Sequence, residues 1–348
     1  MVRHSRFFFA KLVGLAIVLV VLLLFSLGLG SVHLSLQQIV QALLAGVSGR
    51  SGAGDTNWQF TAIVWDFRLA RSLLAMCVGA ALAASGAAFQ GLFRNPLADP
   101  FVIGASSGAA LGATLAIILQ LPLSLGGFGP VPLAAFAGSL LTVLLVYTIS
   151  HTGGNAPPAV ALLLAGTALS SLLSAMVSLL MALRDQKLYQ IFFWLLGGLG
   201  GKSWPQLAAM LPYLGTSIIL LSVLARPLDI MAFGDETARG MGLAVKQARL
   251  LIVVAASLAT AAAVATAGII GFIGLVAPHI ARLLFGPSHR RLLASSALIG
   301  AILLLTADGL ARTILAPVEL PVGILTAILG APFFLYLLRT RQKALGGN

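Results

Sequence analysis

Long apolar segments, separated by short polar turns, follow one another along almost the whole chain. A helix that crosses a lipid bilayer needs about 20 apolar residues, because each residue adds only about 1.5 Å to its length. The pattern therefore predicts an all-α, polytopic membrane protein with about ten transmembrane helices in a single domain over residues 1–348. The predicted spans are 8–30, 70–91, 101–120, 130–150, 158–183, 204–225, 247–267, 271–285, 292–312 and 322–339.

Composition supports the same class of protein. Hydrophobic residues make up 59% of the chain and charged residues only 9%, whereas a soluble domain has about 25% charged residues. A soluble protein of this composition could not cover its surface with polar groups, so we expect the lipid bilayer to be its main surroundings. The formal net charge of +12 would suggest nucleic acid in a soluble protein. Here the cations lie mostly at helix ends, and we expect no nucleic-acid partner.

The distribution of cations predicts the orientation. Arg3, Arg6 and Lys11 precede the first apolar run, which we interpret as an uncleaved span with its N-terminus in the cytoplasm. Ten spans then place both termini on the cytoplasmic side. This topology puts twice as many Lys and Arg residues inside as outside, as the positive-inside rule requires.

The chain offers no convincing catalytic constellation. The segment from Gly197 to Ser203 resembles a phosphate-binding loop, but that motif requires a glycine six residues before Lys202, where the chain has Leu196. The five His residues form no paired metal spacing. We therefore expect no cofactor, no metal site and no ATPase site, and we expect the energy for active transport to come from another chain.

Two arginines at the outer end of the second span suggest a docking site. Arg68 and Arg71 are three residues apart, so they share a helix face. A single arginine there would fit an interfacial anchor, but two on one outer face favour an acidic partner. Asp308 and Arg312 are four residues apart on the ninth span and can pair there, which lowers the cost of an acid in the bilayer. Arg312 then emerges on the same side as the first two arginines.

Two cytoplasmic segments are also candidates. The turn after the second span is stiffened by two prolines, and its Asn and Asp side chains can satisfy free backbone groups. It contains Arg94, Asn95, Pro96, Asp99 and Pro100. The longest cytoplasmic loop, 226–246, holds a short amphipathic helix between glycines, which suits a surface that couples to a soluble motor, with a solvated loop helix as the alternative. The candidate coupling residues are Gly234, Asp235, Glu236, Arg239, Gly240 and Gly242.

The fifth span carries a stripe of small hydroxyl side chains on an otherwise apolar helix. The stripe either packs against another helix through small residues or lines the pathway of a ligand. Its members are Thr167, Ser170, Ser174 and Ser178.

Four motifs, in this order and spacing, resemble the FecCD/BtuC-type permease family, the transmembrane subunits of importers for ferric siderophores, haem and vitamin B12. They are the Arg-x-x-Arg pair, RNPLADP, GFIGLVAPHIAR and ELPVG, and the resemblance covers residues 60 to 338. It implies the type II fold of ATP-binding-cassette (ABC) importers. It also implies a second permease chain in a homodimer, two cytoplasmic ATPase subunits and an extracytoplasmic substrate-binding protein.

The resemblance assigns roles to the candidate residues. By motif position, Arg68, Arg71 and Arg312 meet acidic residues of the binding protein, and 233–243 is the coupling helix that contacts the ATPase. The expected function is import of an iron chelate, a ferric siderophore, across the bacterial inner membrane, with haem or cobalamin as alternatives.

A secondary transporter driven by an ion gradient would need intramembrane acids. Asp308 is the only clear one, and Arg312 partners it.

Overall fold

The structure is a computed structural model that describes residues 2–30, 32, 34–48, 58–122, 129–152 and 158–345. These residues form helices and no strand. The long helices are α1 (Val2–Gly28), α4 (Ala70–Leu92), α5 (Ala105–Leu119), α6 (Pro130–Thr152), α7 (Pro158–Leu183), α9 (Trp204–Val223), α12 (Val245–Ala267), α13 (Ile273–Phe285), α14 (His289–Thr313) and α15 (Val322–Leu345). The shorter ones are α2 (Leu36–Val47), α3 (Trp58–Thr61), η1 (Ala62–Leu69), η2 (Asp185–Lys187), α8 (Leu188–Leu195), α10 (Ala225–Met231) and α11 (Asp235–Gly240).

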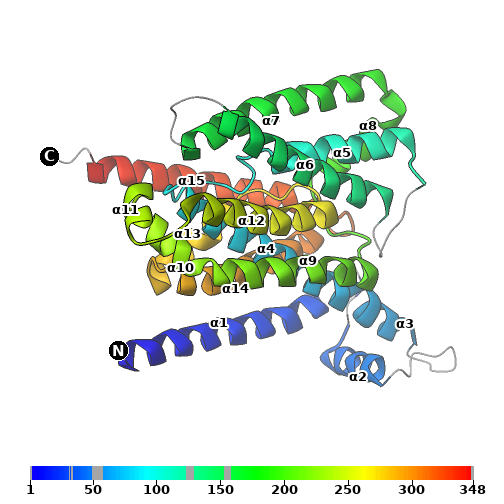
Figure 1. Cartoon of the computed structure of the whole chain (residues 1–348). Coiled ribbons are helices and arrows are strands. Elements are labelled where there is room, and N and C mark those ends of the chain that lie inside the picture. Colours follow the sequence, from blue (N-terminus) through cyan, green and yellow to red (C-terminus); the bar gives the residue numbers. More distant parts are fainter. Residues whose placement is uncertain are drawn as a thin grey trace.

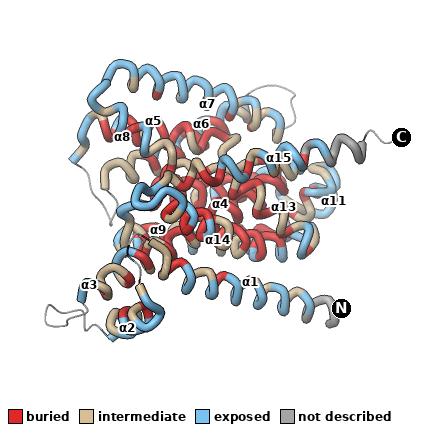
Figure 2. Tube along the Cα trace, turned by 180° about the vertical axis from the view of Figure 1, so that it is seen from behind, coloured by how far each residue is buried: buried red, intermediate tan, exposed pale blue. Residues whose placement is uncertain are grey.

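The long helices lie side by side in one bundle (Figure 1). Helices α4, α13 and α14 lie in its buried centre, whereas α1 and α7 lie at the periphery and are largely exposed (Figure 2). Helix α1 begins and α15 ends at the same end of the bundle, where α11 also lies, and we call this the terminal end (Figure 1). Helices α2 and α3 lie at the opposite end, which we call the distal end.

Each of the ten predicted spans overlaps a long helix. Among the described residues, seven helical segments are long and apolar enough to cross a membrane, and α5, α13 and α15 supply shorter apolar stretches. This confirms the all-α, polytopic class. The third predicted span is 101–120, whereas the helix α5 begins only at Ala105.

The residues between α4 and α5 explain this late start. Asn95 accepts a hydrogen bond from the Leu97 N–H (3.0 Å), and Asp99 accepts one from the Phe101 N–H (2.8 Å), so the side chains satisfy the turning backbone. A Cβ on Gly274 of α13 would lie 2.7 Å from the Pro100 ring and 2.9 Å from a carbonyl oxygen of α4, that of Leu82. The segment predicted as a cytoplasmic turn therefore folds back into the bundle. Irregular backbone at this depth is tolerated where protein surrounds it or where it borders a cavity.

Glycines let the central helices touch backbone to backbone. A Cβ on Gly79 of α4 would lie 2.2 Å from the Gly300 carbonyl oxygen of α14, and one on Gly86 would lie 1.9 Å from the Gly274 carbonyl oxygen of α13. Only glycine fits at such contacts, as is common where helices pack in lipid. These contacts fix α4 against α13 and α14, and so fix the side chains at both ends of those helices.

Two features of the distal end were not predicted. Helix α2 begins with a capping box, in which Ser35 and Gln38 bond to each other's backbone N–H. Residues 62–69 form a π-helix, η1, that continues directly into α4. Such wide turns frequently occur at functional sites.

Candidate functional site

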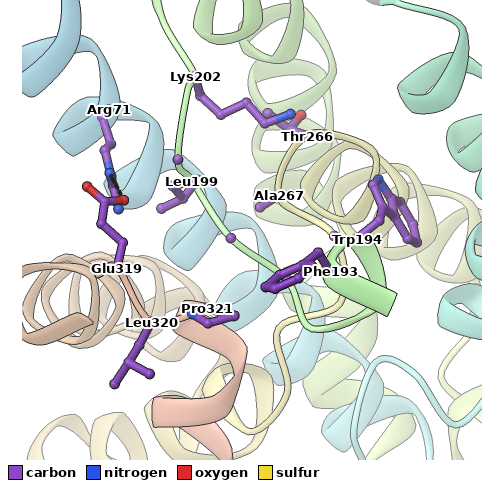
Figure 3. A pocket seen from close by; sticks show the side chains of 14 residues that line it. Arg71, Phe193, Trp194, Leu199, Lys202, Thr266, Ala267, Glu319, Leu320 and Pro321 are labelled. Atoms are coloured by element: carbon purple, nitrogen blue, oxygen red, sulfur yellow. Dashed lines mark hydrogen bonds and ion pairs between the residues drawn. The ribbon is translucent and has the colours of Figure 1, made fainter. Parts of the chain in front are cut away.

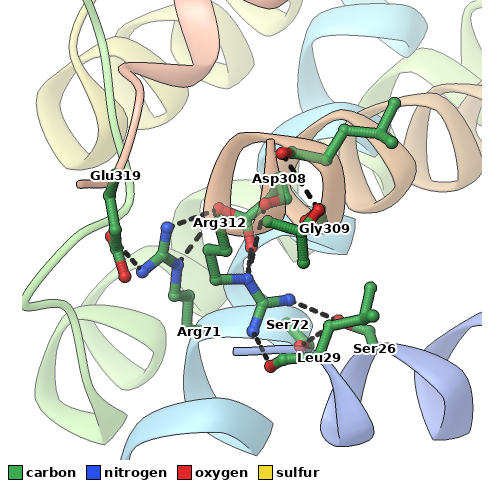
Figure 4. A network of polar contacts seen from close by, with 10 residues as sticks. Ser26, Leu29, Arg71, Ser72, Asp308, Gly309, Arg312 and Glu319 are labelled. Atoms are coloured by element: carbon green, nitrogen blue, oxygen red, sulfur yellow. Dashed lines mark hydrogen bonds and ion pairs between the residues drawn. The ribbon is translucent and has the colours of Figure 1, made fainter. Parts of the chain in front are cut away.

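Asp308 is the centre of an ion-pair cluster at the distal end (Figure 4). Its carboxylate is fully buried and accepts hydrogen bonds from Arg71 Nε (3.1 Å) and Nη2 (2.9 Å). The Nε atom of Arg312 lies 3.1 Å from the other carboxylate oxygen. The predicted pair between Asp308 and Arg312 is thus present. The second partner, Arg71, comes from α4 and was not predicted.

The arginines of this cluster have further partners. Arg71 Nη1 donates to the half-exposed Glu319 carboxylate at 2.8 Å, and Arg312 donates to the Ser26 hydroxyl at 2.6 Å (Figure 4). Arg68 donates to the carbonyl oxygens of Leu27 (2.8 Å) and Val32 (2.5 Å). Among the described residues, no carboxylate pairs with Arg68, so its charge is not neutralised at close range.

The three predicted docking arginines lie together at the distal end, where they line a cavity of about 300 Å³ with Lys202 and Glu319. Of the described residues that line this cavity, four are cations and one, Glu319, is an acid. An excess of positive charge in a confined cavity attracts acidic groups. Arg68 and Arg312 are buried, with 7% and 5% of their surface exposed. The arginines therefore form a cavity wall, with only part of their surface open to solvent.

Lys202 is a cation that the residue patterns did not single out as a site. It follows the glycine-rich turn between α8 and α9 and lines a second distal cavity of about 260 Å³ (Figure 3). Burial lowers the pKa of Lys202 below its usual value, because desolvation disfavours the charged ammonium. Among the described residues, no carboxylate lies within ion-pair distance of it.

At the terminal end, Asp235 ties three segments together. It pairs with Arg94 of the folded-back segment and with Arg249 of α12, while it forms the start of α11. Gly234 (φ 110°) and Gly242 (φ 82°) flank that helix in backbone conformations that favour glycine. Ala238 fixes one face of α11 in the core. The predicted coupling helix is therefore linked by charge to the predicted turn, a contact that sequence spacing did not reveal.

The other face of the α11 segment is open. Glu236, Arg239 and Gly240 are exposed, and so are the large side chains of Phe233 and Met241 at either end. Exposed apolar groups next to charges are typical of protein-binding surfaces. Phe233 and Met241 were missed as site residues, although both lie within the segment 233–243 that the pattern singled out.

The hydroxyl stripe of α7 lines a groove of about 700 Å³. Ser170 bonds to Ser107 of α5 across it (Oγ to Oγ 3.1 Å), and Asp99 of the folded-back segment also lines it. The structure thus brings all four predicted residues of the stripe to one groove, together with hydroxyls of α5. The members of the stripe are Thr167, Ser170, Ser174 and Ser178.

The groove and the Lys202 cavity adjoin each other. Trp194 and Gly268 line the cavity, and the next residue of each segment, Leu195 and Ile269, lines the groove. Lys202 also lines the arginine-walled cavity. Three hollows therefore follow one another, from the arginine cluster to the hydroxyl stripe. Within the described part of the chain, no group of three or more His, Cys, Asp or Glu residues could hold a metal ion.

Comparison with known sequences identifies the family. The profile of the FecCD transport family matches residues 18–340. The chain belongs to this family. It is 43% identical to the "Hemin transport system permease protein HmuU" of Yersinia pestis, over 95% of this chain and 96% of that protein. It is 40% identical to the "Fe(3+)-citrate import system permease protein YfmE" of Bacillus subtilis, over 94% of each.

A solved structure confirms the fold of this FecCD family member. The chain resembles an inward-facing metal-chelate type ABC transporter with a TM-score of 0.80 and 34% identity, over 95% of this chain and 99% of that one. The protein is therefore a membrane-spanning permease of an ABC importer for metal chelates, haem, cobalamin or siderophores. In this family the ATPase is a partner subunit. The relatives have different named ligands, so family membership does not select the ligand.

Proposed function

We propose that this permease carries an iron chelate, a ferric siderophore, across the bacterial inner membrane, with the distal end outside and both termini in the cytoplasm. The observation that carries the proposal is the presence of three features in one bundle. A cationic cavity lies at the distal end, a hydroxyl-lined groove follows, and α11 lies at the terminal end. Together they offer a receiving site, a route and a contact for a motor.

The distal cavity is the proposed docking site for an extracytoplasmic substrate-binding protein. Asp308 already neutralises part of the charge of Arg71 and Arg312, so these two arginines mainly position the cluster. Among the described residues Arg68 contacts only neutral oxygens, so it leaves positive charge for acidic residues of the partner. Charges of this kind set orientation and the rate of encounter more than affinity.

The segment around α11 is the proposed contact with the ATPase. Because Asp235 holds Arg94 and Arg249, a push on α11 is transmitted directly to α12 and to the start of the folded-back segment. That segment ends at Gly104 and contributes Asp99 and Phe101 to the groove. Movement of the ATPase subunits would thus be transmitted to the groove through the Asp235 carboxylate and the irregular segment that ends at Gly104.

The groove favours a second permease chain as its other wall. Thr167, Ser171, Ser174 and Ser178 are exposed on α7, and hydroxyl groups gain little from contact with lipid tails. A copy of the same chain facing this stripe would enclose a route with weakly binding walls, which suits a large ligand that must be released. We therefore propose a homodimer with two ATPase subunits.

Uptake by a strain that lacks this permease tests the proposal. The strain is supplied separately with labelled ferric siderophore, haem and cobalamin, with and without the restored gene. Restored, ATP-dependent uptake of the siderophore is the expected result. If only haem or cobalamin uptake were restored, the proposed siderophore ligand would be wrong. Uptake that persists without the ATPase subunits would contradict the transport mechanism.

A further inference from the structure

The cavity around Lys202 has an unusual charge balance. In the part of the chain that the structure describes, three charged side chains line it: Arg71, Glu319 and Lys202. Arg71 and Glu319 pair with each other at 2.8 Å. The ammonium group of Lys202 is therefore the charge that no lining residue neutralises.

The direction of the Lys202 side chain is also informative. Figure 3 shows it reaching toward Thr266, away from Arg71 and Glu319. The Thr266 hydroxyl donates to the Ala262 carbonyl oxygen at 2.7 Å, so its hydrogen is already committed within α12. The ammonium group thus points into the cavity on the side that adjoins the hydroxyl-lined groove. It does not point toward the face where a partner protein would dock.

The remaining walls suit one arm of a larger molecule. Phe193 and Trp194 contribute aromatic surface on one side (Figure 3). The turn from Gly197 to Gly200, which has no bulky side chain except Leu199, forms another wall. A volume of about 260 Å³ is large enough for a carboxylate-bearing arm and too small for a whole metal chelate.

We propose that Lys202 is a subsite for an anionic, carboxylate-type group of the transported chelate, and that it favours anionic over neutral chelates at the entrance to the groove. The proposal rests on the proposed import function. It gives a role to the glycine-rich turn and its lysine, which lack the phosphate-binding motif. A charge-assisted hydrogen bond from an ammonium to a carboxylate is stronger than one between neutral groups, and partial burial of Lys202 strengthens it further.

Protection from acylation tests the site without a transport assay. The purified permease in lipid nanodiscs is treated with an amine-acylating reagent, and mass spectrometry gives the rate at each lysine. Ferric citrate is expected to slow acylation of Lys202 several-fold at constant ionic strength, and a neutral ferric trihydroxamate is expected to leave it unchanged. Lys187, on the same side of the bundle but outside the cavity, is the internal control. The proposal would be overturned if Lys202 were acylated at the same rate with either chelate, or if ferric citrate protected Lys187 as strongly as Lys202.

Variants separate this subsite from docking and from the import function. In the reconstituted complex, Lys202→Gln is expected to raise the KM for ferric citrate about tenfold, the loss of one charged contact, and Lys202→Arg is expected to restore it. Uptake of the neutral chelate reports whether the import function holds at all. A similar loss with both chelates, or weaker binding of the ligand-free binding protein to Lys202→Gln, would show that the lysine serves the partner and not the ligand.

Discussion

Asp308 at the distal end and Asp235 at the terminal end each contact two arginines, but they join different kinds of structure. Asp308 is fully buried, and its partners Arg71 and Arg312 belong to two long helices that pack closely. Asp235 keeps 19% of its side chain exposed, and Arg94 keeps 44%. Asp235 begins a six-residue helix and holds an irregular segment. The first cluster thus joins two long helices, whereas the second joins one long helix, α12, to a short helix and an irregular segment.

The largest effect is expected from Asp308→Asn. The change keeps the shape of the side chain but leaves the buried Arg312 guanidinium without a counter-ion and Arg71 with Glu319 alone, which costs about 3–5 kcal/mol. Thermal unfolding of the purified permease in nanodiscs measures the loss. Asp235→Asn is the matched control, because its partly exposed site lets solvent compensate. If both variants unfolded at the same temperature, the contrast between the two clusters would be wrong.

A loss of coupling is expected from Asp235→Lys. A third cation beside Arg94 and Arg249 repels both and detaches α11 from the folded-back segment. The ATPase should then hydrolyse ATP while uptake falls by about tenfold or more, as expected when more than about 1.4 kcal/mol of coupling is lost. Parallel assays of hydrolysis and uptake on one preparation measure this. Charge reversal at Asp185, which lies near the distal end, is the control, and normal uptake by Asp235→Lys would remove the coupling role.

A smaller effect is expected from Arg68→Gln at the distal end. Arg68 pairs with no acid among the described residues, so its loss should leave the Asp308 cluster intact and slow association of the binding protein about tenfold at low salt. Stopped-flow binding at two ionic strengths measures this. Arg71→Gln should instead lower thermal stability as well, because it breaks the contact with Asp308. If the binding protein associated with Arg68→Gln as fast as with the unchanged permease at both ionic strengths, docking at this site would be contradicted.

The smallest change tests the groove between the two ends. In a Cys77→Ala background, Ser174→Cys should react with a water-soluble thiol reagent, because Ser174 is exposed and lines the groove. Ser139→Cys is the control, since Ser139 is fully buried on α6. An unreactive cysteine at 174 in every state of the transport cycle would favour helix packing over a pathway.

The sequence was sufficient for the helices because length and polarity alone decide whether a segment can cross a bilayer. It was also sufficient for the pair Asp308–Arg312, because four-residue spacing places both on one helix face. The other partners could not be predicted. Arg71 lies 237 positions from Asp308, and Arg94 lies 141 positions from Asp235. Their contacts depend on which helices become neighbours, and helical periodicity contains no information about that.

The start of α5 shows a different limit. Prolines and Asx-type turns at 95–100 predicted a break in the helix, but they did not show where the chain goes after it. The apolar residues 101–104 suit a membrane helix and equally suit irregular backbone that is covered by protein. Only the packing of Pro100 against Gly274 distinguishes these two outcomes.

The π-helix η1 absorbs one extra residue of the chain, but it makes the contacts of the distal end sensitive to the length of this segment. Trp65 of this segment packs directly on Gly46 of α2 and lies 5.5 Å, centroid to centroid, from Trp204 of α9. The wide turn accommodates one surplus residue while these contacts and the helix that bears Arg71 all keep their places. If evolution or an engineer inserted a further residue into 62–67 that the wide turn did not absorb, everything upstream would rotate by about 100° about the helix axis. Trp65 would then lose its packing contact with Gly46 of α2, although every arginine of the cluster would remain in the chain.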